Sequence, residues 1–130
     1  MALSPNGDLI AYVASLSSPT TQTVFQKLAL VQVDPHSGAS PRLLDVDPRA
    51  TQALQFTADG KSVAYVINDG GVDNIWVEPL DGSKGRQITK FSSKNISSFH
   101  WSPNGKSLAL VRWDSTSDVI LLRDSNALPK

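Results

Sequence analysis

The chain has no cysteine among its 130 residues, so it can form no disulfide bond and offers no thiolate to a metal. Its charged residues make up 18% of the total and balance to a net charge of zero, which argues against a nucleic-acid-binding surface. No apolar run reaches the roughly 18–20 residues that cross a bilayer, and no basic stretch with an apolar core follows Met1. We therefore expect no membrane contact by this segment and no signal peptide.

The chain contains a sequence motif, here called the phrase, that occurs three times, at residues 3–13, 56–66 and 101–111. Each copy has Ser or Thr, then Pro or Ala, then Asn or Asp, then Gly, followed by an apolar run. The glycines Gly7, Gly60 and Gly105 are 53 and 45 residues apart. Periods of this length are typical of stacked supersecondary units. We therefore interpret the chain as a repeat protein.

The second copy predicts four short strands, at about 51–57, 62–67, 74–79 and 86–89. Turn signals such as Asp59-Gly60 and Asp81-Gly82 separate them, because glycine adopts positive φ at little cost. The strand at 62–67 is apolar at both alternating sets of positions, which predicts burial on both faces. No stretch has the 3.6-residue period of an amphipathic helix, so we expect an all-β fold.

The first copy is longer than the other two. Alignment of Leu30 with Trp76 places seven extra residues before its third strand, in the Ser/Thr/Gln-rich stretch 15–26. Only residues 1–3 precede its first turn, and the fourth strand of the third copy would fall near position 134, beyond Lys130. We therefore predict that the first and last repeats are incomplete.

The two histidines are interpreted as structural residues, and the chain has no catalytic or metal-binding motif. His36 lies in a turn, which predicts a solvated residue, and His100 alternates with Phe99 and Trp101 in a strand. The chain has no Gly-x-Ser-x-Gly motif, phosphate loop or His-Glu-x-x-His motif. Catalytic, cofactor-binding and metal-binding residues are therefore each predicted as none, and the binding residues stay undefined.

Two sets of oxygen-bearing residues recur at equivalent turns. Asn6, Asp59 and Asn104 are expected to cap their own turns, and a bound cation is the alternative. The same alternative applies to Asp69, Asp73, Asp114 and Asp118. Near the end of a strand, Arg112 and Trp113 either pack or join a binding surface.

The repeated phrase resembles the repeat of TolB-type β-propellers, although Ala58 replaces the usual Pro and Leu3 the usual aromatic residue. The stretch from Asn74 to Thr89 also resembles the later strands of such a blade. The last copy, residues 99–121, is similar to the end of propellers fused to bacterial serine/threonine kinases or winged-helix regulators. The resemblance implies blades at about 1–48, 49–93 and 94–130, with Phe56, Trp76 and Trp101 supplying bulk between them.

The resemblance implies a non-catalytic module that binds a protein or a small ligand, as part of a larger bacterial signalling or regulatory protein. The alternative is the propeller of a prolyl-peptidase-like hydrolase, whose catalytic domain lies elsewhere. The compartment stays open between periplasm and cytoplasm, since the absence of cysteine fits either.

Three blades cannot close a ring, because closed propellers have about four to eight. The apolar strands at 9–14 and 108–112 would then meet water on the outer faces of the end blades. We therefore expect self-association, with two copies completing a six-bladed homodimer.

Overall fold

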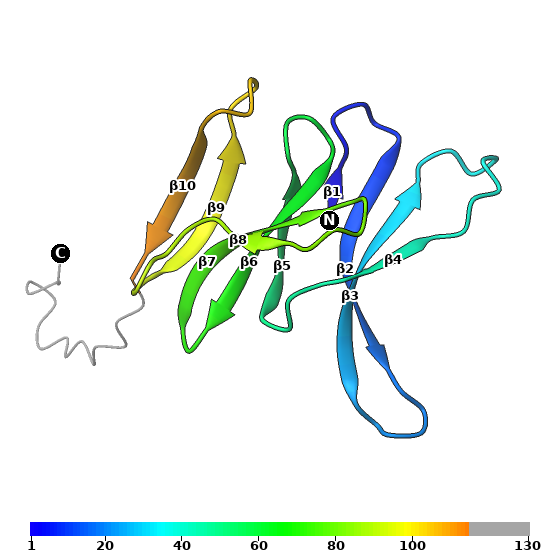
Figure 1. Cartoon of the computed structure of the whole chain (residues 1–130), viewed down its shortest axis with the longest axis horizontal. Helices are drawn as coiled ribbons and strands as arrows, with labels where there is room; N and C mark the ends of the chain where they lie inside the picture. Colours follow the sequence, from blue (N-terminus) through cyan, green and yellow to red (C-terminus); the bar gives the residue numbers. More distant parts are fainter. Residues whose placement is uncertain (115–130) are drawn as a thin grey trace, which may run out of the picture.

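The computed structural model describes residues 1–114 and shows three antiparallel sheets arranged side by side (Figure 1). The described part of the chain contains no helix, and thus none that is long and apolar enough to span a bilayer. The first sheet has the order β1-β2-β3-β4, the second β5-β6-β7-β8, and the third pairs β10 with β9. We call these sheets blade 1, blade 2 and blade 3. The strands are β1 (Ala2–Leu3), β2 (Leu9–Ser17), β3 (Val24–Gln32), β4 (Arg42–Asp45), β5 (Ala50–Phe56), β6 (Ser62–Asp69), β7 (Val72–Pro79), β8 (Arg86–Gln87), β9 (Asn95–Trp101) and β10 (Leu108–Trp113).

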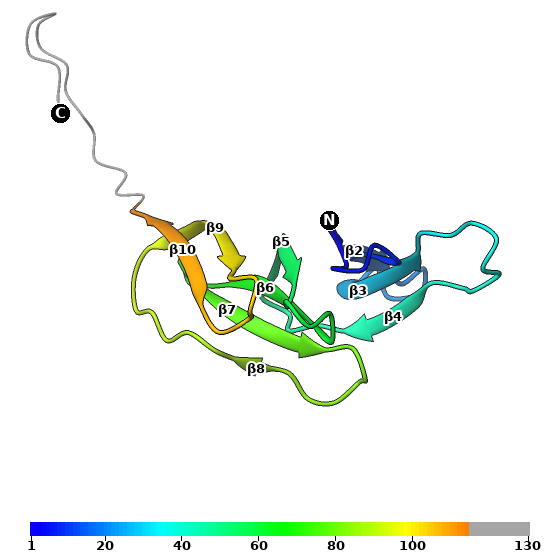
Figure 2. The same ribbon diagram turned by 90° about the horizontal axis from the view of Figure 1, so that it is seen from above.

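The sheets are arranged as a fan. Seen from above, β5 and β9 lie along the inner edge near the N-terminus, and β4 and β8 lie along the outer edge (Figure 2). The expected all-β fold is confirmed, and the first strand of blade 1 is as short as predicted. The end of the third copy, from residue 115 onward, lies outside the described residues.

Two apolar layers hold the blades together. One layer joins blade 1 to blade 2 through buried residues that include Val13, Leu28, Val63 and Tyr65. The other joins blade 2 to blade 3 through Val66, Ile75, Ile96 and Phe99, among others. The middle strand β6 contributes to both layers, since every residue from Val63 to Ile67 is buried. Its burial on both faces was predicted from its sequence.

The bulky residues expected between blades are buried to different degrees. Phe56 is buried in the first layer, whereas Trp76 and Trp101 are partly buried at the margins of the two layers.

The extra residues of blade 1 lengthen the β2–β3 hairpin, which projects beyond the other blades (Figure 1). Tyr12 pairs with Ala29, and Tyr65 at the equivalent position pairs with Trp76. The step along the chain is 17 residues in blade 1 and 11 in blade 2, so the hairpin holds six extra residues. The alignment of Leu30 with Trp76, which gave seven, is therefore wrong by one position. Sequence matching could not fix this position, because only strand pairing shows which residues face one another.

Candidate functional site

The three copies of the repeated phrase form the same turn at one end of the fan. In the second copy, the Gly60 N–H donates to the Thr57 carbonyl at 2.9 Å, and Gly60 has a φ of +71°. The Thr57 hydroxyl donates to the Asp59 carboxylate at 2.7 Å, and this carboxylate also accepts from the Lys61 N–H at 2.9 Å. Together these bonds close a tight hairpin turn.

The other two turns repeat this chemistry. The hydroxyl of Ser4 donates to Asn6 at 2.9 Å, and that of Ser102 donates to Asn104 at 2.7 Å. The side chains that recur in these turns are therefore used in capping, as the sequence predicted. In residues 1–114, no group of three or more His, Cys, Asp and Glu side chains is placed to hold a metal ion.

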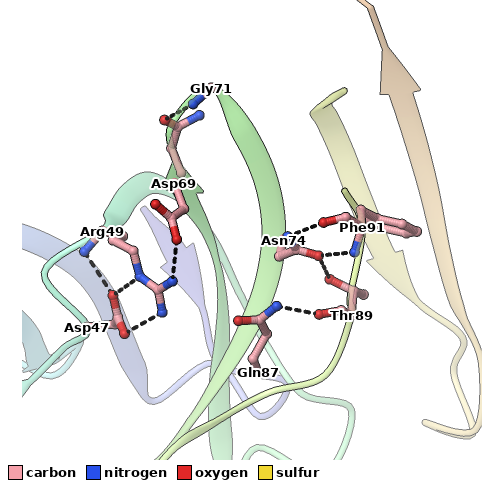
Figure 3. A network of polar contacts seen from close by, with 9 residues as sticks. Asp47, Arg49, Asp69, Gly71, Asn74, Gln87, Thr89 and Phe91 are labelled. Carbon is pink, nitrogen blue, oxygen red and sulfur yellow. Dashed lines mark hydrogen bonds and ion pairs between the residues drawn. The ribbon is translucent and has the colours of Figure 1, made fainter. Parts of the chain in front are cut away.

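The aspartates near the blade connections also take part in structural bonds (Figure 3). Arg49 bridges the carboxylates of Asp47 and Asp69, at 2.8 Å and 3.0 Å. The buried Asp73 accepts from the Asn68 amide at 2.7 Å and from the Ile96 N–H at 2.8 Å. The bond to Ile96 joins blade 2 to blade 3, and Arg49 joins the segment that follows blade 1 to the end of β6. Asp114 is exposed, and Asp118 lies outside the described residues.

The segment that links blade 2 to blade 3 is held by one amide side chain (Figure 3). Asn74 Oδ1 accepts from the Phe91 N–H at 2.7 Å and from the Thr89 hydroxyl at 2.8 Å. The guanidinium of Arg112 lies 3.6 Å from the centre of the Phe91 ring and donates to the Ser93 carbonyl. Arg112 thus packs on this link, whereas its neighbour Trp113 is about half exposed.

The two histidines lie in different parts of the fold. His36 is exposed in the β3–β4 turn, as predicted. His100 is exposed on β9, and its Nδ1 accepts a hydrogen bond from the Gln55 amide at 3.0 Å. Gln55 and His100 are 45 residues apart, which is the repeat period, so equivalent positions of two inner strands are bonded to each other.

A hollow of about 510 Å³ lies where the inner strands meet the repeated turns, and all three blades line it. Blade 1 contributes Leu3 and Pro5, blade 2 contributes Gln55 and Phe56, and blade 3 contributes Trp101 and Pro103. Most of the lining side chains are apolar, but the surface exposed inside the hollow is about equally polar and apolar. The hollow can therefore offer both apolar contacts and hydrogen bonds to a bound molecule. We regard this hollow as the candidate binding site.

Sequence reasoning did not assign these residues to a site. The sequence could have indicated the site only through the repeat. Leu3, Phe56 and Trp101 start the three copies of the phrase, and Pro5 and Pro103 occupy its third position. A repeated unit in a radial array brings equivalent residues to one place around the axis.

Radiating antiparallel sheets joined by apolar layers define a β-propeller. The structure of TolB from Acinetobacter baumannii is similar over 90% of this chain and 27% of its own, with a TM-score of 0.65 and 20% identity. The Tol-Pal system protein TolB of a Polaromonas species is 40% identical over 62 residues. The chain thus has the fold of a TolB-type β-propeller.

Peptidases are also among the similar proteins. Dipeptidyl aminopeptidase BIII of Pseudoxanthomonas mexicana is 35% identical over 66 residues. The acylaminoacyl peptidase structure from Pyrococcus horikoshii matches 90% of this chain, with a TM-score of 0.57 and 17% identity. The chain spans only 9% of the curated peptidase and 14% of the curated TolB. No family model matches the sequence.

Proposed function

We propose that this chain is a non-catalytic interaction module that binds a short segment of a partner protein in the hollow at the inner edge of the blades. The observation that carries the proposal is that three successive blades line this hollow, with Leu3, Phe56 and Trp101 at its walls. An extended peptide laid across the inner strands would contact all three blades. Apolar side chains in the walls provide the affinity, and the Gln55 amide provides a hydrogen-bonding group that selects a sequence.

Nearby polar groups favour binding over catalysis. His100 has a glutamine as its hydrogen-bond partner, and the hydroxyl of Ser102 is engaged with Asn104. A serine nucleophile requires a general base at its hydroxyl. At this site the hydroxyl instead closes a turn.

A peptide-display library selected against the immobilised chain tests the proposal. Pro103→Glu places a charge at the exposed rim of the hollow, and the fold should tolerate it because Ala58 occupies the equivalent position in blade 2. We expect the selected peptides to bind Pro103→Glu at least about tenfold more weakly. Pro41→Glu is the matched control, since Pro41 is exposed outside the hollow. Equal binding to the parent chain and to Pro103→Glu would refute the site.

A second candidate function is the propeller of a prolyl-peptidase-like hydrolase, which the 35% identity to dipeptidyl aminopeptidase BIII favours. A nucleophile-elbow hydrolase domain in the same reading frame would support this candidate. Turnover of an ester or peptide by the pure chain, abolished by changing one polar residue, would contradict the non-catalytic assignment in both cases.

A further inference from the structure

The β2–β3 hairpin of blade 1 has a strand edge that no other strand covers. β4 pairs with β3 only from Lys27 to Leu30, and the β3 residues 24–26 continue past that pairing toward the hairpin tip (Figure 1). Within residues 1–114, no strand pairs with this stretch on the side away from β2. An uncovered edge presents backbone N–H and C=O groups to which another strand can be added.

The equivalent positions of blade 2 show which backbone groups point to this edge. By strand pairing, Gln26 of β3 corresponds to Asp73 of β7. The Asp73 N–H donates to the Lys94 carbonyl at 3.0 Å, so it points away from β6 and toward the outer edge of its strand. Alternate residues of a strand direct their backbone groups to the same edge. In β3, both Val24 and Gln26 therefore direct their N–H and C=O groups to the free edge.

In blade 2 the chain itself covers the equivalent edge. The link at residues 88–94 runs beside β7 and bonds to the Asp73 N–H, and the Asp73 carboxylate accepts from the Ile96 N–H at 2.8 Å. In blade 1 the link to the next blade places Pro48 beside the edge, and proline has no N–H to donate. The same edge is thus satisfied by a further segment of chain in blade 2 and is open in blade 1.

A second hollow, here called the hairpin hollow, lies beside the free edge. Its volume is about 310 Å³, and it is lined by Val24, Phe25, Gln26 and Pro48. The exposed fractions of Val24 and Phe25 are 67% and 41%, so the hollow offers apolar contact. The Oε1 atom of Gln26 is buried and has no hydrogen-bond partner among residues 1–114. A buried acceptor without a donor costs free energy, so a donor brought to this edge would stabilise the complex.

Charge indicates the composition of the segment that fits. Residues 15–26 contain no Asp, Glu, Lys or Arg. The adjacent Lys27 forms an ion pair with Asp45, so these two charges neutralise each other. A charged side chain pressed against the hairpin would lose water without gaining an opposite charge, which is unfavourable. The edge therefore matches a segment of uncharged polar and apolar residues.

We propose that the free edge of β3 binds an extended, uncharged segment of a partner protein, which pairs with Val24 and Gln26 as an added strand. The added strand continues the line of β4 along β3, and one of its apolar side chains enters the hairpin hollow beside Pro48. A blade stacked on blade 1 would cover a face of the sheet, whereas this edge lies in the plane of the sheet. The two kinds of contact therefore use different surfaces.

A library of random peptides displayed on phage and selected against the immobilised full chain supplies the probes. Val24→Pro removes an N–H that points to the free edge, and the fold should tolerate it because this N–H does not bond to β2. Val24→Ala is the matched control, since it also removes the valine side chain but keeps the N–H. Peptides that bind the edge should bind Val24→Pro at least about tenfold more weakly than Val24→Ala, as expected for a lost hydrogen bond. Circular dichroism and melting temperatures show whether both variants are folded.

N-methylation of the selected peptides tests whether they bind as a strand. Methylation of the alternate amides that face β3 should abolish binding, whereas methylation of the other set should leave it unchanged. Bound peptide should also slow the exchange of the Val24 and Gln26 N–H groups with solvent. Pro103→Glu should leave this binding unchanged, because Pro103 lines the hollow at the inner edge of the blades.

Two results would overturn the proposal. One is a selection that yields no peptide sensitive to Val24→Pro. The other is equal loss of binding on methylation of either set of amides, because a paired strand uses only one set. Peptides that are sensitive to Pro103→Glu and not to Val24→Pro would overturn the edge site and leave the function proposed for the inner hollow intact.

Discussion

The hydroxyl of Tyr65 accepts a hydrogen bond from the backbone N–H of Asp47 at 2.9 Å. Tyr65 is a fully buried residue of the middle strand of blade 2, and Asp47 lies in the connection that leaves blade 1. A side chain in the apolar layer thus holds the segment between two blades. The bond is one of several by which the connection is fixed, since Arg49 also joins Asp47 to Asp69.

Substitution of this hydroxyl should destabilise the fold. Tyr65→Phe leaves the Asp47 N–H without its acceptor, so we expect the free energy of unfolding to fall by about 1–2 kcal/mol. Tyr12→Phe is the matched control, because the same atom is removed at the equivalent position of blade 1, where the side chain is 39% exposed. This control should stay within about 0.5 kcal/mol of the parent. Urea unfolding at one protein concentration measures both variants, and equal losses would contradict the role of the bond.

Near this connection, the pKa of one carboxyl group is raised and the pKa of another is lowered. Burial raises the pKa of Glu78, although the Trp76 indole N–H donates to it at 2.7 Å. A group with a raised pKa stabilises the fold at low pH, and that stability is lost as the pH rises through its folded pKa. We expect Glu78→Gln to raise the free energy of unfolding at pH 7 and to have little effect near pH 4.

Asp47 has a lowered pKa, so the pH dependence of its contribution to stability is the opposite of that of Glu78. Hydrogen bonds from the Arg49 side chain hold the pKa of Asp47 below its ordinary value of 3.8. Its contribution is present at neutral pH and is lost as the pH falls through the folded pKa. Asp47→Asn should therefore destabilise at pH 7, with a difference that shrinks below about pH 3.8. Unfolding curves at several pH values separate the two variants, and a gain in stability for Asp47→Asn at pH 7 would contradict this explanation.

The loop before β8 depends on a glycine for steric reasons. A Cβ at Gly85 would lie 1.9 Å from Glu78 Oε2 and 2.7 Å from the backbone oxygen of Val77. The carboxylate can move, but the Val77 oxygen is fixed in the sheet. We expect Gly85→Ala to lower the free energy of unfolding by about 1–3 kcal/mol.

Gly82→Ala is a useful comparison in the same loop. Its Cβ would meet nothing within 4 Å, but its φ of +85° disfavours any side chain. A loss of about 1–2 kcal/mol is expected there from backbone strain alone. The two causes can be separated with the double variant Glu78→Ala/Gly85→Ala, which should recover part of the loss at Gly85. If Gly85→Ala unfolds at the same urea concentration as the parent, the loop is not packed on β7.

The sequence was sufficient for features whose causes are local. The turn at Asp59 and Gly60 could be predicted because one side chain and one glycine close it. The burial of Val63 to Ile67 followed from an apolar run on both faces. The bond between Gln55 and His100 could not be predicted, because it depends on how two inner strands 45 residues apart approach each other.

The candidate binding hollow could not be predicted from the sequence either. Its residues come from three blades and are brought together only by the curvature of the fan. The period predicted that Leu3, Phe56 and Trp101 are equivalent, but not that a cavity lies between them. The size of the β2–β3 insertion was wrong for a related reason, since pairing across the hairpin sets the alignment.

The six extra residues of the β2–β3 hairpin can be tested by deletion. In blade 2, Asp69 pairs with Val72 across Gly70-Gly71, and in blade 1 the equivalent pair is Leu16 and Phe25. Removing residues 18–23 and placing glycine at positions 17 and 24 would therefore rebuild the blade 2 turn between Leu16 and Phe25. The remaining pairs, such as Tyr12 with Ala29, keep their register, and the chain should fold with a melting temperature close to that of the parent.

Removal of a seventh residue gives the matched comparison. Only one residue would then connect Leu16 to Phe25, whereas the tight hairpin turn needs two. The strands would have to slip or open, and a slip of one residue would turn either Val13 or Leu28 away from the layer that they share with blade 2. We expect the seven-residue deletion to melt several degrees lower than the six-residue deletion. Equal melting temperatures for the two deletions would show that the register of this hairpin does not depend on the length of its turn.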